Sequence, residues 1–333
     1  MFNLVEKRRY YFLFSGIITL IGVITLIYST IETDRPLQLS IDFTGGQLFE
    51  LQFTEPVEEQ ELRDTFTAAG FQQLVVQELT PLETELLDET AYPDGSRWSV
   101  RTEEVDDVAS IDDTLAYIEE NLNPLDLEAT TTSEVSGAVG DEVTQAAILA
   151  TLAATAVTLI FMWFAFRRVP HPFRYGACAI AAMIHDILIM LTAMSILGLL
   201  FDWQADTLFL TAMLTVVGFS VQDTIVVFDR IRENIPKRRN ETYETVVNRS
   251  ILETIHRSLA TQLNAIFVMV AIALFGGETI RQFIIILLVG LTTGTYSSIF
   301  IAVPLLVAWQ KGEIPFLKPS EEEVSAPAVR ASA

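Results

Sequence analysis

Apolar residues gather in six long runs, separated by short polar segments and by one long polar segment. Each run reaches or approaches the roughly 20 apolar residues that cross the hydrocarbon core of a bilayer. The pattern therefore predicts a polytopic α-helical membrane protein with six transmembrane helices. The expected spans are residues 11–31, 143–166, 173–200, 207–228, 258–275 and 280–309.

The first span follows Lys7, Arg8 and Arg9, as the hydrophobic part of a signal peptide follows its basic residues. The span is long, however, and lacks a convincing small-residue cleavage site. We therefore interpret it as a retained first helix.

The long polar segment, residues 32–140, is large enough to form a soluble domain with its own core. Alternating apolar and polar positions predict strands, and amphipathic stretches predict helices. The expected order is strand 38–53, helix 58–70, strands 71–79 and 98–102, helix 108–122 and strand 130–136. This βαββαβ order favours a ferredoxin-like α+β domain with its helices on one face of the sheet.

Two adjacent glycines, Gly45 and Gly46, interrupt the first expected strand. Such a pair is typical of a turn or bulge where a side chain does not fit. Two interpretations stay open, a tight hairpin and a contact surface for a polypeptide.

The charge is very unevenly distributed. The chain has a formal net charge of -22, and residues 32–134 hold 26 of the 43 acidic side chains but only 4 of the 21 basic ones. Such a surface excludes nucleic acid as a ligand of this segment, because phosphate binding needs basic residues. The segment contains no His or Cys, which excludes a zinc cluster and a Cys–His nucleophile. We expect no enzyme activity, no metal and no organic cofactor.

The clusters of basic residues that flank the spans, at 7–9, 167–174, 230–249 and 311–318, fall on one side, which sets the orientation by the positive-inside rule. Both termini are expected in the cytoplasm and the acidic domain outside. The chain then divides into residues 1–31 (N-terminus and first helix), 32–140 (external domain), 141–310 (five helices with a cytoplasmic loop at 229–256) and 311–333 (a disordered cytoplasmic tail).

Ionisable residues inside the spans are the candidates for function, because a charge in hydrocarbon is expensive to keep. Asp223 lies in the fourth span, and Arg257 lies at the mouth of the fifth. Their depths allow a pair in which Arg257 favours the charged carboxylate while desolvation favours the neutral one. The alternative is a carboxylate held permanently by Arg257 or by the hydroxyls of Ser220 and Thr224.

Two further features of the spans allow more than one interpretation. His185 and Asp186, in the third span, form either part of an ion pathway or a mutually satisfied polar pair. Gly290 and Gly294, followed by Thr295, Ser297 and Ser298, have the small-residue spacing of closely packed helices.

Several motifs carry a resemblance to a known family. They are IDFTGG at 41–46, GFSVQDTIVVFDRIREN at 218–234, HRS at 256–258, LFGG at 274–277 and GTYSSIFIA at 294–302. With one span, a large external domain and five further spans, they closely resemble the SecF subunits of the bacterial Sec protein translocase, in the resistance-nodulation-division-like superfamily. The likeness covers nearly all of the chain except the tail.

The resemblance implies a subunit that uses the proton or sodium motive force to promote late stages of protein export across the cytoplasmic membrane. The implied partners are SecD, the SecYEG channel, YajC, the translocating preprotein and membrane lipid. The resemblance maps ion coupling to Asp223 and Arg257, and the external signature to Asp42, Gly45 and Gly46. The expected supporting residues in the spans are His185, Asp186, Ser220, Thr224 and Asn264.

Two positions depart from the family pattern, Gln222 in place of Asn and Asn264 in place of a small hydroxyl residue. Two other functions fit part of this pattern. One is a half-size exporter of lipids or drugs from the same superfamily, although such exporters usually carry about twelve spans. The other is a membrane-anchored enzyme or sensor, in which Asp223 would have no evident role.

Overall fold

The structure, a computed structural model, describes residues 3–71, 74–79, 96–102, 111–167, 171–201, 203–238, 240–276 and 278–314. Within these ranges, six helices are long and apolar enough to cross a membrane, which confirms the predicted fold class. They are Val5–Thr33, Gly137–Ala165, Pro172–Phe201, Thr207–Lys237, Tyr243–Phe275 and Ile280–Gln310.

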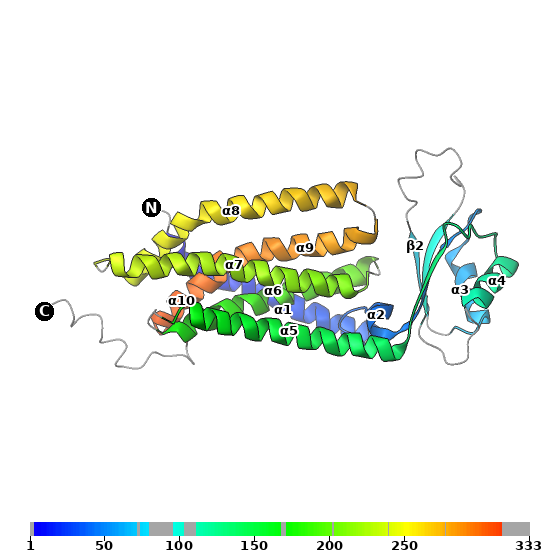
Figure 1. Cartoon of the computed structure of the whole chain (residues 1–333), viewed down its shortest axis with the longest axis horizontal. Coiled ribbons are helices and arrows are strands. Elements are labelled where there is room, and N and C mark those ends of the chain that lie inside the picture. The colour runs from blue at the N-terminus through cyan, green and yellow to red at the C-terminus, as the bar shows by residue number, and fades with distance from the viewer. Residues whose placement is uncertain are drawn as a thin grey trace.

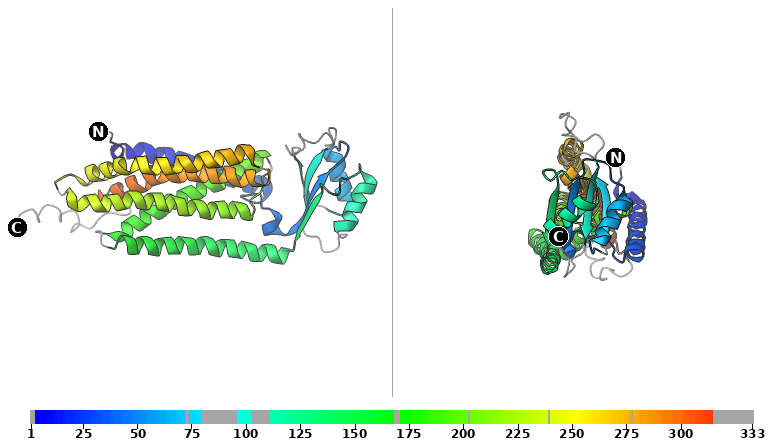
Figure 2. Two further views of the ribbon diagram at one scale, coloured as in Figure 1. Left: turned by 45° about the horizontal axis from the view of Figure 1, so that its top comes forward. Right: turned by 90° about the vertical axis from the view of Figure 1, so that its right-hand side faces the viewer.

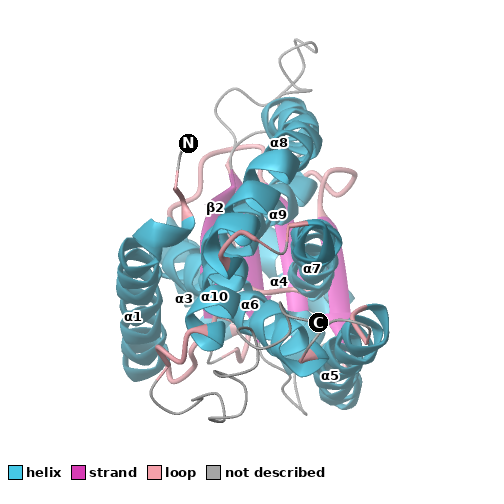
Figure 3. Cartoon of the chain, turned by 90° about the vertical axis from the view of Figure 1, so that its left-hand side faces the viewer, coloured by secondary structure: helices cyan, strands magenta, loops and turns pink. Residues whose placement is uncertain are grey.

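The spans form an elongated bundle (Figure 1). Their elements are α1 (Arg8–Thr33, after the 3-10 turn η1, Val5–Lys7), α5 (Gly137–Ala165), α6 (Pro172–Phe201), α7 (Thr207–Lys237), α8 (Tyr243–Phe275), and a last span of α9 (Glu278–Ser297), the π-helical turn η3 (Ser298–Ala302) and α10 (Val303–Gln310). The most apolar windows of α6, α7 and the last span are 39, 50 and 56% buried, against 17, 6 and 11% for α1, α5 and α8. The first three therefore form the centre, and α1 and α5 lie at opposite edges (Figures 2 and 3).

The α+β domain follows α1 and lies at one end of the bundle, away from both termini (Figure 1). It consists of β1 (Gly46–Gln52), α3 (Glu59–Ala68), β2 (Leu74–Leu79), β3 (Arg97–Thr102), α4 (Ile111–Asn121) and β4 (Thr131–Val135). The sheet order is β2-β3-β1-β4, and every neighbouring pair is antiparallel. This is the predicted βαββαβ order.

The domain has a hydrophobic core of its own between the sheet and its two helices. Phe49 of β1 is fully buried, and its ring centroid lies 5.3 Å from that of Phe66 on α3 and 6.2 Å from that of Phe71. Aromatic pairs at this spacing add packing energy beyond the burial of their area. The opposite face of the sheet is turned toward the helix bundle (Figure 1).

The predicted first strand, 38–53, is wrong in its first half. Residues Ile41–Thr44 form the one-turn helix α2, and the strand starts only at Gly46. Gly45 and Gly46 have positive φ values of 73° and 120°, so they connect α2 to β1 and do not form a hairpin. A Cβ at Gly45 would lie 2.7 Å from the backbone of Gly137, at the start of α5. The glycine is thus required for a close backbone approach.

The expected loop at 229–256 is mostly helical. Helix α7 continues to Lys237 and α8 begins at Tyr243, so only residues 238–242 connect them. The reason is that charged residues at helical spacing extend both helices beyond the apolar runs, with ion pairs such as Arg230–Glu253 at 2.6 Å across the hairpin. Most of the predicted disordered tail, residues 315–333, lies outside the described residues.

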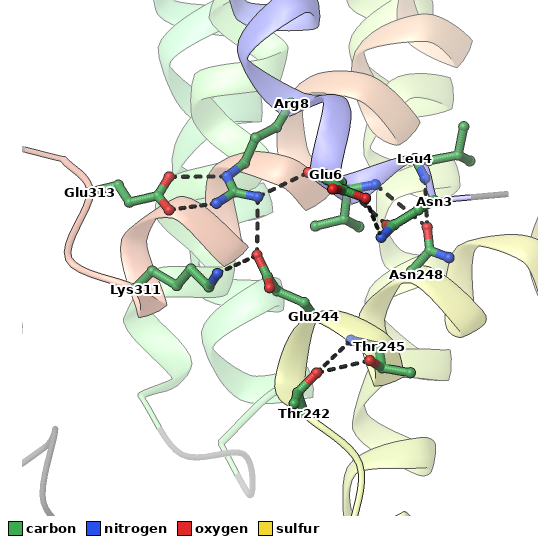
Figure 4. A network of polar contacts seen from close by, with 11 residues as sticks. Asn3, Leu4, Glu6, Arg8, Thr242, Glu244, Thr245, Asn248, Lys311 and Glu313 are labelled. Atoms are coloured by element: carbon green, nitrogen blue, oxygen red, sulfur yellow. Dashed lines mark hydrogen bonds and ion pairs between the residues drawn. The ribbon is translucent and has the colours of Figure 1, made fainter. Parts of the chain in front are cut away.

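At the end of the bundle opposite the domain, a buried arginine joins three segments (Figure 4). Arg8, at the start of α1, is 8% exposed and binds Glu244 of α8 and Glu313 after α10. Lys311 also contacts Glu244, at 2.6 Å. The hydrogen bond from Arg8 lowers the pKa of the Glu313 carboxyl. The sequence used Arg8 only to predict the orientation in the membrane. In the structure, Arg8 also joins the start of α1 to α8 and to the segment after α10.

Glycines of α9 allow the central helices to approach each other, as the predicted small-residue spacing requires. A Cβ at Gly290 would lie 2.4 Å from Val216 of α7 and 2.8 Å from the sulfur of Met190 on α6. A Cβ at Gly218, by contrast, would meet nothing within 4 Å.

We expect Gly290→Ala to destabilise the bundle by about 1–3 kcal/mol, because the added methyl group overpacks the contact with α7. Gly218→Ala is the matched control and should leave stability unchanged or slightly raised, since alanine favours the helix. The measurement is the thermal unfolding midpoint of the full chain in detergent. Equal midpoints for the two variants would contradict the packing role of Gly290.

Candidate functional site

Several polar contacts converge on the carboxylate of Asp186, near the middle of α6. It is 1% exposed, and one of its oxygens accepts hydrogen bonds from Ser220 of α7 at 2.6 Å and Ser297 of α9 at 2.7 Å. Its other oxygen lies 3.1 Å from Nδ1 of His185. Three central helices thus meet at a single carboxylate.

More hydroxyl groups extend this cluster along the interface of α7 with the last span. The Ser298 hydroxyl donates to the backbone carbonyls of Ser220 and Gly294, at 3.0 and 2.8 Å, and the Thr224 hydroxyl donates to Ser298 at 3.0 Å. Ser298 opens the π-helical turn η3, a departure from regular helix that often marks functional sites. A Cβ at Gly294 would lie 3.1 Å from the Ser220 Cβ, so the glycine permits this approach.

His185 connects the cluster to the periphery of the bundle. Its ring lies 6.4 Å from that of Tyr296, whose hydroxyl is 3.0 Å from Ser15 of α1. The side chain of His185 is 10% exposed, and its Nε2 is buried with no hydrogen-bond partner among the described residues. The Asp186 cluster therefore contains one polar atom that is available for a further partner.

Asp223 forms a second, simpler site. It lies on α7, three residues after Ser220. It is 8% exposed and accepts a 2.7 Å hydrogen bond from Gln262 of α8. In the part of the chain that the structure describes, it forms no ion pair with Arg257, which is exposed. The pairing that the sequence suggested is thus absent from this conformation.

The amide that reaches Asp223 is that of Gln262, whereas Asn264, expected as a supporting polar residue, lies elsewhere on α8. Gln262 is 4% exposed, whereas Asn264 is exposed. Two residues along an α-helix are separated by about 200°, so the two amides point to opposite sides of α8. The signal for Gln262 was present as a polar residue in an apolar run, but the sequence did not show which face is buried.

The external signature residue Asp42 binds the first turn of α7. Its carboxylate accepts hydrogen bonds from the backbone N–H of Thr207 at 3.0 Å and from its hydroxyl at 2.9 Å. Asp206 caps the same helix through Phe209 N–H at 2.7 Å. Burial raises the pKa of Asp206, the hydrogen bond from Phe209 opposes this, and the nearby Asp42 carboxylate raises it further. Both carboxylates suit the positive end of the helix dipole.

Backbone bonds fix this junction as well. Ser40 N–H donates to Ala205 O at 2.9 Å, and Ala205 N–H donates to Gln38 O at 2.7 Å. The segment before β1 is therefore attached directly to the segment before α7.

The predicted residues thus fall into three places. Asp186 gathers His185 and Ser220, with Thr224 nearby, while Asp223 lies beside Gln262 and Asp42 lies at the outer end of α7. Arg257 and Asn264 join none of these sites in this conformation. Ser297 and Gln262 were not predicted as carboxylate partners. Within the described ranges, no group of three or more His, Cys, Asp or Glu side chains could hold a metal ion.

These features define a multi-pass membrane protein with ionisable groups inside its bundle and a soluble domain attached at one end. Residues 115–312 match the family described as Protein export membrane protein SecD/SecF, C-terminal, and residues 33–57 match the SecD/SecF GG Motif. The chain belongs to this family, among the SecF subunits of protein translocase.

Three similar proteins illustrate the relationship. Protein translocase subunit SecF of Thermobaculum terrenum is 38% identical over 98% of this chain and 100% of its own length. Protein translocase subunit SecDF of Bacillus subtilis is 30% identical over 93% of this chain but 38% of that longer protein. The crystal structure of SecDF from Thermus thermophilus, described as a translocon-associated membrane protein, has a TM-score of 0.74 at 27% identity, covering 93% of this chain and 39% of the other.

We expect Asp42→Ala to loosen the first turn of α7, because it removes the acceptor of two hydrogen bonds to Thr207. A charge-assisted bond contributes about 1.5–3 kcal/mol, so amide exchange over residues 205–212 should accelerate about tenfold or more. The measurement is hydrogen exchange of the full chain by mass spectrometry. Asp64→Ala, at an exposed site on α3, is the control, and unchanged exchange in Asp42→Ala would contradict the attachment.

Proposed function

We propose that the chain works beside SecD to convert the proton or sodium motive force into movement of the α+β domain, which promotes late stages of protein export. The observation that carries this proposal is the pair of buried carboxylates, Asp186 and Asp223, in helices that contact each other. Neither has a Lys or Arg ion-pair partner among the described residues. A buried carboxylate without a permanent counter-charge favours binding of a cation.

Helix α7 supplies the route from ion to domain. It contributes Ser220 to the Asp186 cluster and carries Asp223 three residues later, while its first turn is bound by Asp42. Asp42 lies just before the glycines that open β1. A change in charge at either carboxylate would shift the balance of contacts that hold α7, and the shift would reach the sheet through this attachment.

Arg257 has a conditional role in this mechanism. It lies on α8 five residues before Gln262, the partner of Asp223, but on an exposed part of that helix. We propose that Arg257 approaches Asp223 only in another conformation, after α8 moves relative to α7. The carboxylate would then exchange a neutral amide partner for a cationic one, which favours release of the bound ion.

The orientation and the partners belong to the same proposal. Lys and Arg at the end of the bundle opposite the domain support a cytoplasmic location for both termini by the positive-inside rule. The α+β domain would then contact the emerging preprotein outside, and SecD, SecYEG and YajC would complete the assembly. The SecDF proteins, in which a similar region forms part of one longer chain, support SecD as the partner.

The test is export in proteoliposomes that contain the full translocase and an imposed ion gradient. We expect Asp223→Asn and Arg257→Ala each to reduce gradient-stimulated completion of export about tenfold or more, and to leave gradient-independent export unchanged. Asp229→Asn is the matched control, because it is the same change on the same helix at a partly exposed carboxylate that pairs with Arg232 beyond the apolar run. Export stimulation equal to that of the parent in both variants would refute the coupling role.

The identity of the ion is a separate measurement. Imposing a proton gradient and a sodium gradient one at a time, in otherwise identical vesicles, distinguishes the two. A carboxylate binds either ion, so the expected result is stimulation by one of them that is lost in Asp223→Asn. Stimulation that survives this substitution under both gradients would exclude Asp223 as the coupling residue.

A further inference from the structure

A cavity of about 780 Å³ lies where the α+β domain meets the outer end of α1 and the turn between α6 and α7. Its walls come from the residues that follow α1, from α3, β2 and β3 of the domain, and from Gln204 before α7. Thr33, the last residue of the first span, is part of the lining, so the cavity lies at the end of that span where the α+β domain is attached.

The charge of this cavity is the reverse of its surroundings. Residues 32–134 contain 26 acidic side chains and 4 basic ones, yet three of the four basic side chains line this one cavity. They are Arg35, Arg63 and Arg101, and the only acidic residue in the lining is Asp34. Arg63 reaches Glu59 at 2.9 Å, outside the lining, and donates to the carbonyl of Leu74 at 3.1 Å.

The remaining lining has two kinds of surface. Gln204 is 7% exposed, and its Oε1 has no hydrogen-bond partner among the described residues, so this buried acceptor is available to a hydroxyl donor, such as those of a glycerol headgroup. Leucine, isoleucine and valine side chains form an apolar part of the wall. A ligand with an anionic head, polar atoms for an amide and a short apolar portion would match all of these groups.

The geometry points to a binding site for the headgroup of an anionic phospholipid from the leaflet on the domain side. Guanidinium groups recognise phosphate with paired, charge-assisted hydrogen bonds. The cavity lies at the membrane surface, where such headgroups are concentrated and where an acidic domain otherwise repels them. A bound headgroup would join the end of α1 to the sheet and hold the domain close to the bilayer.

A neighbouring cavity defines the limit of the site. This second cavity, of about 440 Å³, shares Ile41, Arg101 and Gln204 with the first but is lined by Asp42, Glu134 and Asp206. The carboxylates would repel a phosphate there, so the headgroup is expected on the side of Arg35 and Arg63.

The experiment titrates the full chain in neutral detergent with dioleoyl-phosphatidylglycerol and counts bound lipid by native mass spectrometry. We expect the double variant Arg63→Gln/Arg101→Gln to weaken binding about tenfold or more, as two charge-assisted contacts are lost. Arg35→Gln is a second variant, at an exposed position, and should weaken binding about three- to tenfold. Arg97→Gln is the control, since Arg97 is the one basic residue of the domain outside the cavity and pairs with Glu50.

Competition decides what part of the ligand is recognised. Glycerol phosphate should displace the lipid and phosphatidylcholine should not, whereas displacement by inorganic phosphate alone would identify a free-phosphate site and overturn the lipid assignment. Preferential binding of an acidic peptide over phosphatidylglycerol would also overturn it. Equal weakening by Arg97→Gln and by the cavity variants would mean diffuse electrostatic attraction and no built site. The export activity proposed above does not enter any of these readouts.

Discussion

A carboxylate inside a helix bundle must be solvated by the protein, because lipid and apolar side chains provide no hydrogen bonds. Leaving such a group without partners costs several kcal/mol, and more if it is charged. Asp186 meets this requirement with hydroxyls from two other helices and an adjacent histidine. The need to satisfy this group fixes how α6, α7 and the last span pack together, and the other helices are arranged around these three.

The close packing of the central helices depends on small side chains as much as on polar ones. Gly290 and Gly294 bring the backbone of α9 near α7, and only then can Ser297 and Ser298 reach Asp186 and Ser220. The glycine and serine residues therefore act together. Glycine sets the distance between the helices, and the hydroxyls use that distance to bind the carboxylate.

The α+β domain is attached to the bundle by short polar contacts at the start of α7. Asp42 and the backbone of residues 38–40 bind the segment 205–207, while Gly45 packs directly on the first residue of α5. These contacts connect the first strand of the sheet to two membrane helices. In the proposed function, these contacts would pass a movement of α7 to the α+β domain.

The apolar runs were sufficient to predict six spanning helices, and the period-two and helical patterns predicted the order of the α+β domain. These features are local, since they depend on how a single segment partitions between water and an apolar phase. Asp223 and Asp186 could be identified in the same way, because any carboxylate within an apolar run is costly. The sequence did not predict where α7 ends and α8 begins, because ion pairs between the two helices extend them. It did not predict the helical turn at 41–44 either, because close backbone contacts with α5 determine the conformation of this segment.

The partners of each ionisable side chain were decided by the tertiary structure. The sequence suggested Arg257 for Asp223, but the rotation of α8 brings Gln262 to that carboxylate and turns Arg257 and Asn264 outward. It also suggested Ser220 for Asp223, whereas the close approach of three helices directs this hydroxyl to Asp186. Sequence alone determined which residues must be satisfied within the membrane. Which neighbours satisfy them depends on helix rotation and separation, and these are set by side-chain packing between segments that are far apart along the chain.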